Sequence, residues 1–343
     1  MSKIEVKNIY KIFGDHPERI LPMVRDGATK EEVRDETDHT VGLDNVSLSI
    51  KEGEIFVCMG LSGSGKSTLI RHINRLIDPT SGAVSVDGVD VLELNHNELL
   101  EFRKHTMSMV FQRFGLFPHK TIIENVAFGL EVQKIPADER DETARMQIEA
   151  VGLQGFEDQY PAQLSGGMQQ RVGLARALAT NPQILLMDEA FSALDPLIRS
   201  DMQNQLIDLQ AKLKKTIVFI THDLDESLRL GDHIGILNGG RLVQVGRPED
   251  IIINPADDYV KAFVKDVNRS KVLRAKTVMT KVDEFDAKNI NPSNIYSIEE
   301  NVVIEDIIPK VLKERSTINV VDNQGDTMGY ITANELSDAL TKH

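Results

Sequence analysis

The chain of 343 residues has a single cysteine and no hydrophobic run long enough to cross a membrane. One thiol, Cys58, excludes an intramolecular disulfide and fits a reducing cytoplasm. It lies in the apolar run EIFVCM (residues 54–59), so we expect a buried core thiol rather than a nucleophile. A bilayer span needs ~20 apolar residues, and the start MSKIEVKN lacks the apolar core of a signal peptide. These absences predict a cytoplasmic protein that reaches any membrane through a partner.

Positive charge is also scarce. The 39 Lys and Arg residues face 53 Asp and Glu residues, which gives a formal net charge of -14. This balance argues against nucleic acid or anionic lipid as the main partner, although it leaves room for a local basic patch. The hydrophobic content of 41% and the charged content of 27% are typical of a folded protein. The length favours one main domain with an appendage.

The N-terminal region reads as two strands separated by a polar insertion. The alternation in IEVKNIYKIF suggests an edge strand, and strand character resumes at LDNVSLSI. Between them, residues 14–40 are dense in charge. Thr29 and Glu32 have the spacing of a capping box, which predicts a short surface helix. A solvated decoration and a binding role both remain open for this insertion.

Apolar strands then alternate with helical segments, which predicts an α/β fold with a parallel sheet covered by helices on both faces. The segments IGILNGG and RLVQVG predict a hairpin that turns on Gly239-Gly240, and DDYVKAFVKDV predicts a closing helix near residue 268. The expected strands are residues 54–59, 106–111, 184–188 and 216–221.

A basic linker, NRSKVLRAK, leads to a tail that we interpret as a small α+β unit over residues 269–343. The segment INVVDNQGDTMGYIT predicts two strands joined by a tight turn. Thr332 and Glu335 form a second capping box, which predicts the start of the last helix.

The string GLSGSGKST follows an expected strand, precedes an expected helix and satisfies the P-loop pattern G-x-x-x-x-G-K-[ST]. Its glycines let the backbone curl so that amides converge on phosphate oxygens, and the helix N-terminus adds its positive dipole. Lys66 is expected to reach the β- and γ-phosphates of a nucleotide and Ser67 to ligate Mg²⁺. The predicted phosphate-binding residues are Gly60, Leu61, Ser62, Gly63, Ser64, Gly65, Lys66, Ser67 and Thr68.

Polar residues end three other strands of the expected sheet. Asp188 and Glu189 follow ILLMD; we expect the first to bind Mg²⁺ through water and the second to polarise the attacking water. His222 follows TIVFIT and is expected to donate to the γ-phosphate, and Gln112 follows TMSMVF and is expected to touch Mg²⁺. Lys66, Gln112, Glu189 and His222 are thus the predicted catalytic residues, and Ser67, Gln112 and Asp188 the predicted metal ligands.

With LSGGMQQR (residues 164–171) and SALD (residues 192–195), these motifs occur in the order and spacing of an ABC-type ATPase cassette, which residues 1–268 resemble. The resemblance implies a P-loop NTPase fold with a parallel core, an antiparallel β subdomain and a helical subdomain. It implies that two copies pair head to tail, that Phe13 packs on adenine and that Asp195 communicates across the interface. The signature residues that it brings to the partner's ATP are Leu164, Ser165, Gly166, Gly167, Met168 and Gln169.

Finer features resemble the ATP-binding subunit of glycine betaine/proline importers: MGLSGSGKST, LIRHINRLIDPTSG, the insertion before LDNVSLSI, and DEAFSALDPLIR. The tail, with VMT at residues 278–280, is similar to one cystathionine-β-synthase-type (CBS) module, for which regulation and dimerisation both remain open. Many nucleotide-binding modules carry aspartate where this chain has Glu335.

The resemblance implies an ATPase that energises compatible-solute import at the cytoplasmic face of the membrane. Its partners are then a second copy, a permease and, indirectly, a solute-binding protein, with no nucleic acid. We expect residues 111–130 to form the groove that receives a permease helix, with ordinary core as the alternative. Import of an amino acid or polyamine and a soluble ATPase acting on DNA or the ribosome are the alternative functions.

Overall fold

The computed structural model describes residues 2–112, 115–192, 194–285 and 294–341. The chain divides into two compact units, which we call the N-terminal unit (residues 1–245) and the C-terminal unit (residues 246–343). The functional boundary expected at residue 268 stays a prediction. No helix among the described residues is both long and apolar enough to cross a bilayer.

The main sheet of the N-terminal unit has the strand order β10-β9-β3-β8-β7-β6, and its central strands are parallel and buried. Every residue of β3, β7 and β8 is buried, as a parallel sheet covered on both faces requires. Strand β3 pairs in parallel with β8 and β9, and β7 with β6 and β8. The four predicted strands are confirmed, and β9 and β10 are sheet neighbours joined at Gly239-Gly240. The bounds are β3 (Ile55–Met59), β6 (Met107–Val110), β7 (Ile184–Asp188), β8 (Thr216–Thr221), β9 (His233–Asn238) and β10 (Arg241–Gly246).

A second sheet is antiparallel, with strand order β2-β1-β4-β5. Its strands are β1 (Ser2–Phe13), β2 (Thr40–Lys51), β4 (Ser81–Val86) and β5 (Val89–Asp90). The prediction of an edge strand for β1 is wrong, because β1 pairs with both β2 and β4. Alternation reports that one face of a strand is solvated, and an interior strand of an antiparallel sheet shows the same alternation.

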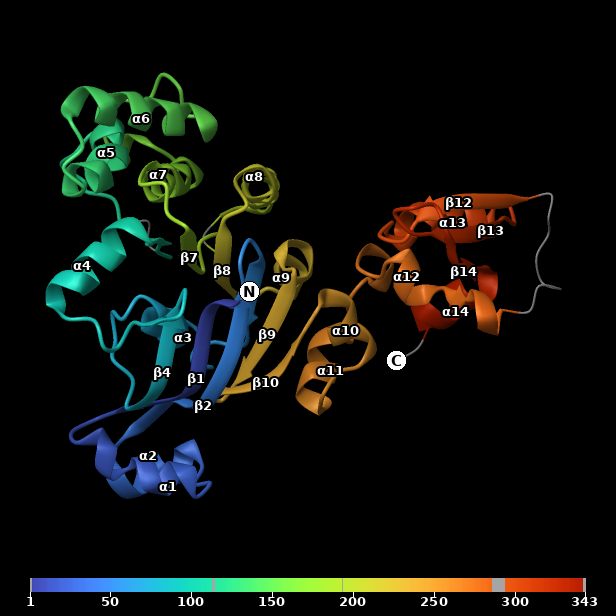
Figure 1. Ribbon diagram of the computed structural model, residues 1–343, viewed down its shortest axis with the longest axis horizontal. Coiled ribbons are helices and arrows are strands. Elements are labelled where there is room, and N and C mark those ends of the chain that lie inside the picture. Colours follow the sequence, from blue (N-terminus) through green and yellow to red (C-terminus); the bar gives the residue numbers. More distant parts are fainter. Residues whose placement is uncertain (1, 113–114, 193, 286–293, 342–343) are drawn as a thin grey trace. The chain divides into compact units, whose positions relative to one another are not determined.

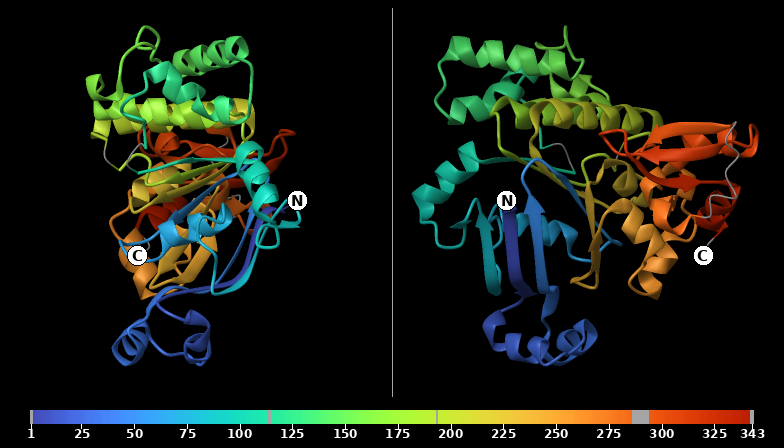
Figure 2. Two further views of the ribbon diagram at one scale, coloured as in Figure 1. Left: turned by 90° about the vertical axis from the view of Figure 1, so that its left-hand side faces the viewer. Right: turned by 45° about the vertical axis from the view of Figure 1, so that its right-hand side comes forward.

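The polar insertion between β1 and β2 folds into η1 (Pro17–Arg19), α1 (Leu21–Arg25) and α2 (Lys30–Thr37). The predicted capping box is present: Thr29 N donates to Glu32 Oε2 at 2.7 Å and Glu32 N to Thr29 Oγ1 at 3.2 Å. In Figures 1 and 2 both α-helices lie at one end of the N-terminal unit, beyond β1 and β2. The insertion is therefore a folded element of this unit.

The remaining helices of the N-terminal unit include a group of three, α5, α6 and α7, that pack on one another. In Figures 1 and 2 this green group lies at the opposite end of the unit from α1 and α2. It is the helical subdomain expected from the resemblance. The bounds are α3 (Lys66–Ile73), α4 (His96–His105), α5 (Ile122–Val132), α6 (Ala137–Ala150), η2 (Pro161–Gln163), α7 (Gly166–Ala179), α8 (Pro196–Leu213) and α9 (Leu224–Leu230).

The C-terminal unit has a sheet of order β11-β14-β13-β12. Strand β13 pairs in parallel with β12 and antiparallel with β14, which confirms the predicted hairpin. Thr332 N donates to Glu335 Oε2 at 2.8 Å and begins the last helix, as predicted. The bounds are α10 (Pro248–Ile253), α11 (Asp258–Val264), η3 (Arg269–Lys271), α12 (Ala275–Val278), β11 (Thr280–Lys281), η4 (Val282–Glu284), β12 (Ile295–Glu299), α13 (Ile304–Leu312), β13 (Thr317–Val321), β14 (Thr327–Ile331) and α14 (Ala333–Thr341).

Cys58 lies in the middle of β3 and is fully buried, as predicted. Burial raises the pKa of its thiol to about 12. Since the thiolate is the reactive form, we expect no alkylation of the native protein by iodoacetamide at pH 8 and complete alkylation in guanidinium, both measured by mass spectrometry. Rapid alkylation of the native chain would contradict this core assignment.

Candidate functional site

The glycine loop between β3 and α3 takes a backbone course that only glycine adopts readily. Gly60, Gly63 and Gly65 have φ values of 154°, 78° and 104°. A Cβ on Gly65 would lie 2.7 Å from the Gly42 carbonyl oxygen, so this residue also lacks the room for a side chain. Helix α3 begins directly after it, at Lys66. The chain thus presents curled backbone and a helix N-terminus together, the arrangement that binds phosphate.

Lys66 is almost fully buried, and the loop itself holds its ammonium group. Lys66 Nζ donates to the carbonyl oxygens of Gly60 at 2.8 Å and Leu61 at 3.0 Å. Glu189 Oε1 lies 3.9 Å away. Burial lowers the pKa of Lys66, and the carboxylate of Glu189 opposes this shift. A buried cation with one carboxylate nearby is suited to an anionic ligand.

Two oxygen donors meet where α3 passes the end of β7. Ser67 Oγ donates to Asp188 Oδ1 at 2.7 Å, and Arg71 Nη2 lies 3.6 Å from Asp188 Oδ2. The described residues contain no group of three His, Cys, Asp or Glu side chains that could hold a metal. A hydroxyl and a carboxylate are nonetheless ligand types that Mg²⁺ accepts when phosphates and water complete its shell, so these residues fit that ion.

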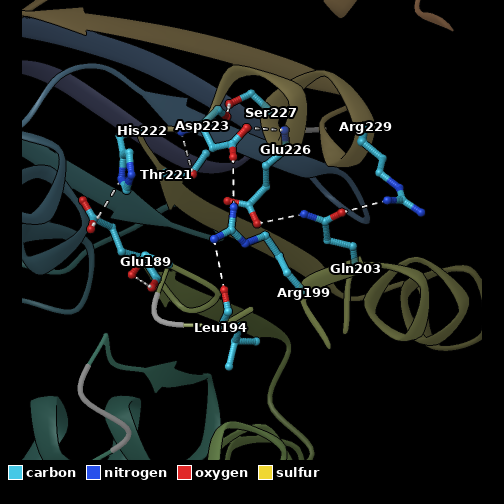
Figure 3. A network of polar contacts seen from close by, with 11 residues as sticks. Glu189, Leu194, Arg199, Gln203, Thr221, His222, Asp223, Glu226, Ser227 and Arg229 are labelled. Carbon is cyan, nitrogen blue, oxygen red and sulfur yellow. Dashed lines mark hydrogen bonds and ion pairs between the residues drawn. The ribbon is translucent and has the colours of Figure 1, made fainter. Parts of the chain in front are cut away.

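Glu189 lies at the meeting point of three strand ends. Gln112 Nε2 donates to Glu189 Oε2 at 2.8 Å. His222 Nδ1 lies 3.7 Å from the same oxygen (Figure 3). The backbone of Glu189 has φ 46°, in the left-handed region, which costs a non-glycine residue about 1 kcal/mol. The structure therefore brings Lys66, Gln112, Glu189 and His222 together, as the strand ends predicted.

A cavity of about 570 Å³ joins the glycine loop to Phe13. The Phe13 side chain is 40% exposed, and a Cβ on Gly42 would lie 2.7 Å from Phe13 Cε2. The aromatic face is therefore presented to the cavity rather than to the core. The lining residues are Phe13, Lys30, Glu31, Arg34, Thr40, Val41, Gly42, Ser62, Gly63, Gly65, Lys66, Ser67, Thr68, Gln112 and Glu189.

The signature residues 164–169 and Asp195 do not line this cavity. Ser165 caps α7 by accepting a hydrogen bond from Met168 N at 3.3 Å, and Ser165 and Gly166 are exposed. Asp195 caps α8 in the same way through Ile198 N at 3.1 Å. A Cβ on Gly167 would lie 2.7 Å from Ile198 Cγ2, so the starts of α7 and α8 adjoin. The chain has a second surface with exposed backbone at a helix start, separate from the cavity.

A polar network ties the His222 loop to α8 (Figure 3). Arg199 Nη1 donates to Asp223 Oδ2 at 3.2 Å, and Arg199 Nη2 donates to the Leu194 carbonyl oxygen at 3.1 Å. Deeper in the network, Gln203 Nε2 donates to Glu226 Oε1 at 3.1 Å. These bonds fix the segment after Glu189 relative to the segment after β8.

Glu226 supplies a pH test of this network. Burial raises the pKa of its carboxyl group above the usual range, so folding favours the protonated form. The folded state therefore loses stability as the pH rises through that pKa. We expect Glu226→Gln to raise the Tm by about 2–4 °C at pH 8, the shift that ~1 kcal/mol produces, and to have little effect near pH 4.5. Thermal melts at both pH values measure this.

The exposed Glu142 offers a matched control, because Glu142→Gln removes the same charge from the surface of α6. Its Tm should follow the wild type at both pH values. A Tm gain for Glu226→Gln that is equal at pH 4.5 and 8 would contradict titration of Glu226 as the cause.

Sequence reasoning missed several residues at the site. Lys30, Glu31 and Arg34 of the insertion line the cavity, and Arg71 faces Asp188. Lys30 and Arg34 have i, i+4 spacing on the predicted helix, which places them on one face. That spacing was a usable signal, but only the tertiary placement of α2 directs the face toward the glycine loop.

The family model and the similar proteins all identify ABC transporter ATP-binding proteins as the relatives of this chain. The family model described as ABC transporter matches residues 43–192. The chain is 52% identical to the glycine betaine/carnitine transport ATP-binding protein GbuA of Listeria monocytogenes, over 100% of this chain and 84% of that protein. It is 55% identical to the glycine betaine/proline betaine transport system ATP-binding protein ProV of Escherichia coli, over 80% of this chain and 69% of that protein.

Among solved structures, the fold is similar to the dimeric ATP-binding cassette MJ0796 in a post-hydrolysis state bound to ADP and Pi. The TM-score is 0.62 at 33% identity, and the match covers 71% of this chain and 98% of that one.

Proposed function

The chain belongs to the family of ABC transporter ATP-binding subunits that serve importers of glycine betaine and related compatible solutes, and we propose the role of each site residue in ATP binding and hydrolysis. It is an ATPase coupled to solute transport, and ATP is its substrate. The observation that carries the proposal is the separation of two half-sites on one chain. The cavity has the glycine loop, Glu189 and His222, while the exposed signature at Ser165 lies outside it.

In this proposal Phe13 packs on the adenine, and the amides of the glycine loop with Lys66 bind the phosphates. Glu189 takes the proton of the attacking water, and Gln112 holds the Glu189 carboxylate in place through its hydrogen bond. His222, which lies 3.7 Å from the same carboxylate, donates to the γ-phosphate. Ser67, Asp188 and Gln112 are the residues that would hold Mg²⁺, which when bound neutralises charge on the phosphate oxygens. Ser165, Gly166 and Gly167 reach the γ-phosphate in a second copy.

Two copies then close around two ATP molecules. ATP contacts the signature only in the closed pair, so it has a higher affinity for that state and can shift the equilibrium toward it. Hydrolysis removes the γ-phosphate contact and reopens the pair. The dimeric cassette MJ0796, which shares the fold, supports pairing as the mode of assembly.

We propose a permease as the membrane partner, docked on residues 111–130, with the subunit held at the cytoplasmic face. Asn125 is fully buried and fixes the loop before α5 by donating to the carbonyl oxygens of Phe117 and Thr121. The Phe117 ring packs 4.5 Å from that of Phe128, so part of this segment is core. Phe111 is 39% exposed and available to a partner. Arg113 and Phe114 lie outside the described residues.

For the C-terminal unit we propose a CBS-like module. The order β12-α13-β13-β14-α14, with β12 parallel to β13, supports it. Regulation and dimerisation predict different results for Glu335→Gln, which removes a charge from a cavity of about 1000 Å³ within this unit. A shifted salt dependence of ATP hydrolysis supports regulation, whereas an unchanged salt dependence with a weakened dimer supports dimerisation.

The function is tested by purifying the chain from its native host under mild detergent. Co-purification with an integral membrane protein, and ATP-dependent uptake of radiolabelled glycine betaine by the reconstituted complex, support the importer. Co-sedimentation with ribosomes or DNA instead would overturn it. Proline, carnitine and choline as competitors in the same assay identify the range of solutes.

A further inference from the structure

Helix α2 of the insertion is anchored firmly enough to serve as a wall of the ATP cavity. Val33, on its inner face, is fully buried and belongs to a small core with Val24, Ile12 and Val41. The capping box at Thr29 fixes its first turn. The polar residues of the same helix are therefore presented at defined positions rather than on a loose loop.

One polar face of α2 meets the cavity. Lys30, Glu31 and Arg34 share its lining with Phe13 and with the glycine loop. Lys30 and Arg34 lie four residues apart and hence on one side of the helix. The insertion thus adds two cations and one carboxylate, a net positive charge, to a cavity whose proposed ligand is an anion.

The Lys30 ammonium group lies beside the glycine turn that supports the P-loop. A Cβ on Gly240 would be 3.1 Å from Lys30 Nζ and 2.8 Å from the Gly42 carbonyl oxygen. Gly240 N in turn donates to the Ser64 carbonyl oxygen at 2.9 Å. Lys30 therefore lies close to the point where the glycine loop meets Gly42 of β2.

The charged Lys30 ammonium group has no direct hydrogen-bond or ion-pair partner in the part of the chain that the structure describes. The two carboxylates that act on it are Glu31 and Asp44, and Asp44 Oδ2 already accepts a hydrogen bond from Arg241 Nε at 2.6 Å. Burial lowers the pKa of Lys30, and the charges of Glu31 and Asp44 only partly oppose this shift.

The position of Lys30 along the cavity selects the part of the nucleotide that it meets. Gly42 connects the two ends of the cavity, because it adjoins the Phe13 ring on one side and Gly65 on the other. Lys30 lies beside Gly42. With adenine on Phe13 and the β- and γ-phosphates at Lys66, the atoms in between are the ribose and the α-phosphate.

We propose that Lys30, carried by the insertion, binds the α-phosphate of the nucleotide and is a positioning residue for ATP, with Arg34 flanking the ribose. This inference rests on the proposed function. Because the α-phosphate is present in both ATP and ADP, Lys30 contributes equally to the binding of each. It acts on nucleotide affinity and takes no part in the cleavage step.

The test compares Lys30→Met with the wild type by calorimetric titration of ADP, and of ATP in a Glu189→Gln background that prevents turnover. We expect the Kd of both nucleotides to rise about tenfold, the loss typical of one charged hydrogen bond. Lys30→Arg should remain within about threefold of the wild type, because it keeps the charge. In steady-state assays the KM for ATP should rise and kcat should be retained.

Arg19→Gln is the matched control, because it removes one positive charge from an exposed position of the same insertion outside the cavity. Lys30→Gln provides a second neutral variant, and Tm values without nucleotide exclude a folding defect. An ADP Kd within twofold of the wild type overturns the proposal, and so does a loss confined to ATP, which would place Lys30 at the γ-phosphate. If the wild type binds neither nucleotide, the proposed function itself fails.

Discussion

Glu189→Gln is expected to lower steady-state ATP hydrolysis by about a hundredfold or more while ATP binding persists. Glutamine has nearly the shape of glutamate and can still pair with Gln112, whose amide lies 2.8 Å from Glu189 Oε2. It has no basic oxygen, however, to take the proton of the attacking water. Phosphate release measures the rate, and calorimetry measures the affinity for ATP.

The same variant should accumulate the closed pair, because bound ATP is no longer consumed. Gel filtration with ATP should show a dimer for Glu189→Gln and a monomer without nucleotide. Glu142→Gln, on the exposed face of α6, should behave as the wild type. Undiminished hydrolysis in Glu189→Gln would refute the role of this carboxylate, and a persistent monomer would refute pairing by the isolated subunit.

Two inactive variants are expected to restore activity when mixed. Lys66→Ala removes the cation of the glycine loop, and Ser165→Arg fills the exposed surface at the start of α7. If each catalytic site combines the loop of one chain with the signature of the other, a mixed pair keeps one intact site. An equimolar mixture should recover about a quarter of the wild-type rate if pairing is random and the sites are independent.

Each variant alone should be inactive, and so should a chain that carries both substitutions, even when it is mixed with Lys66→Ala. The recovered ATPase activity should be proportional to the product of the concentrations of Lys66→Ala and Ser165→Arg. An inactive mixture would mean either that hydrolysis requires two intact sites in one pair or that the signature acts on ATP bound to its own chain. Binding of a fluorescent ATP analogue to Ser165→Arg checks that this variant retains a functional loop of its own.

The positions of most site residues could be predicted because they depend on strand ends. Lys66, Gln112, Glu189 and His222 all follow apolar runs that read as parallel strands, and the carboxyl ends of such strands meet at one edge of the sheet. Cys58 was predictable for the same reason, since a wholly apolar strand is buried on both faces. These predictions needed only the alternation of apolar strands with helical segments along the sequence, and the rule that parallel strands are joined by right-handed crossovers.

Two features were not accessible in this way. The place of β1 inside its sheet depends on pairing with β4, whose paired residues lie 71 to 82 positions away, from Tyr10–Ser81 to Ile4–Val86. Alternation records only which face of a strand is solvated. The role of Lys30 depends on Val33 and a few other apolar residues, which seat α2 against β1 and β2. A short amphipathic helix in an insertion has no local signal for the surface on which it packs.

The left-handed backbone at Glu189 has a consequence for laboratory evolution. Glycine adopts φ 46° freely, so Glu189→Gly relieves local strain at the cost of the carboxylate. In a library that is screened for thermal stability alone, we therefore expect enrichment of Glu189→Gly. Such variants would be more stable but would no longer hydrolyse ATP. Directed evolution of this subunit toward higher thermal stability must therefore select for ATPase activity in the same round.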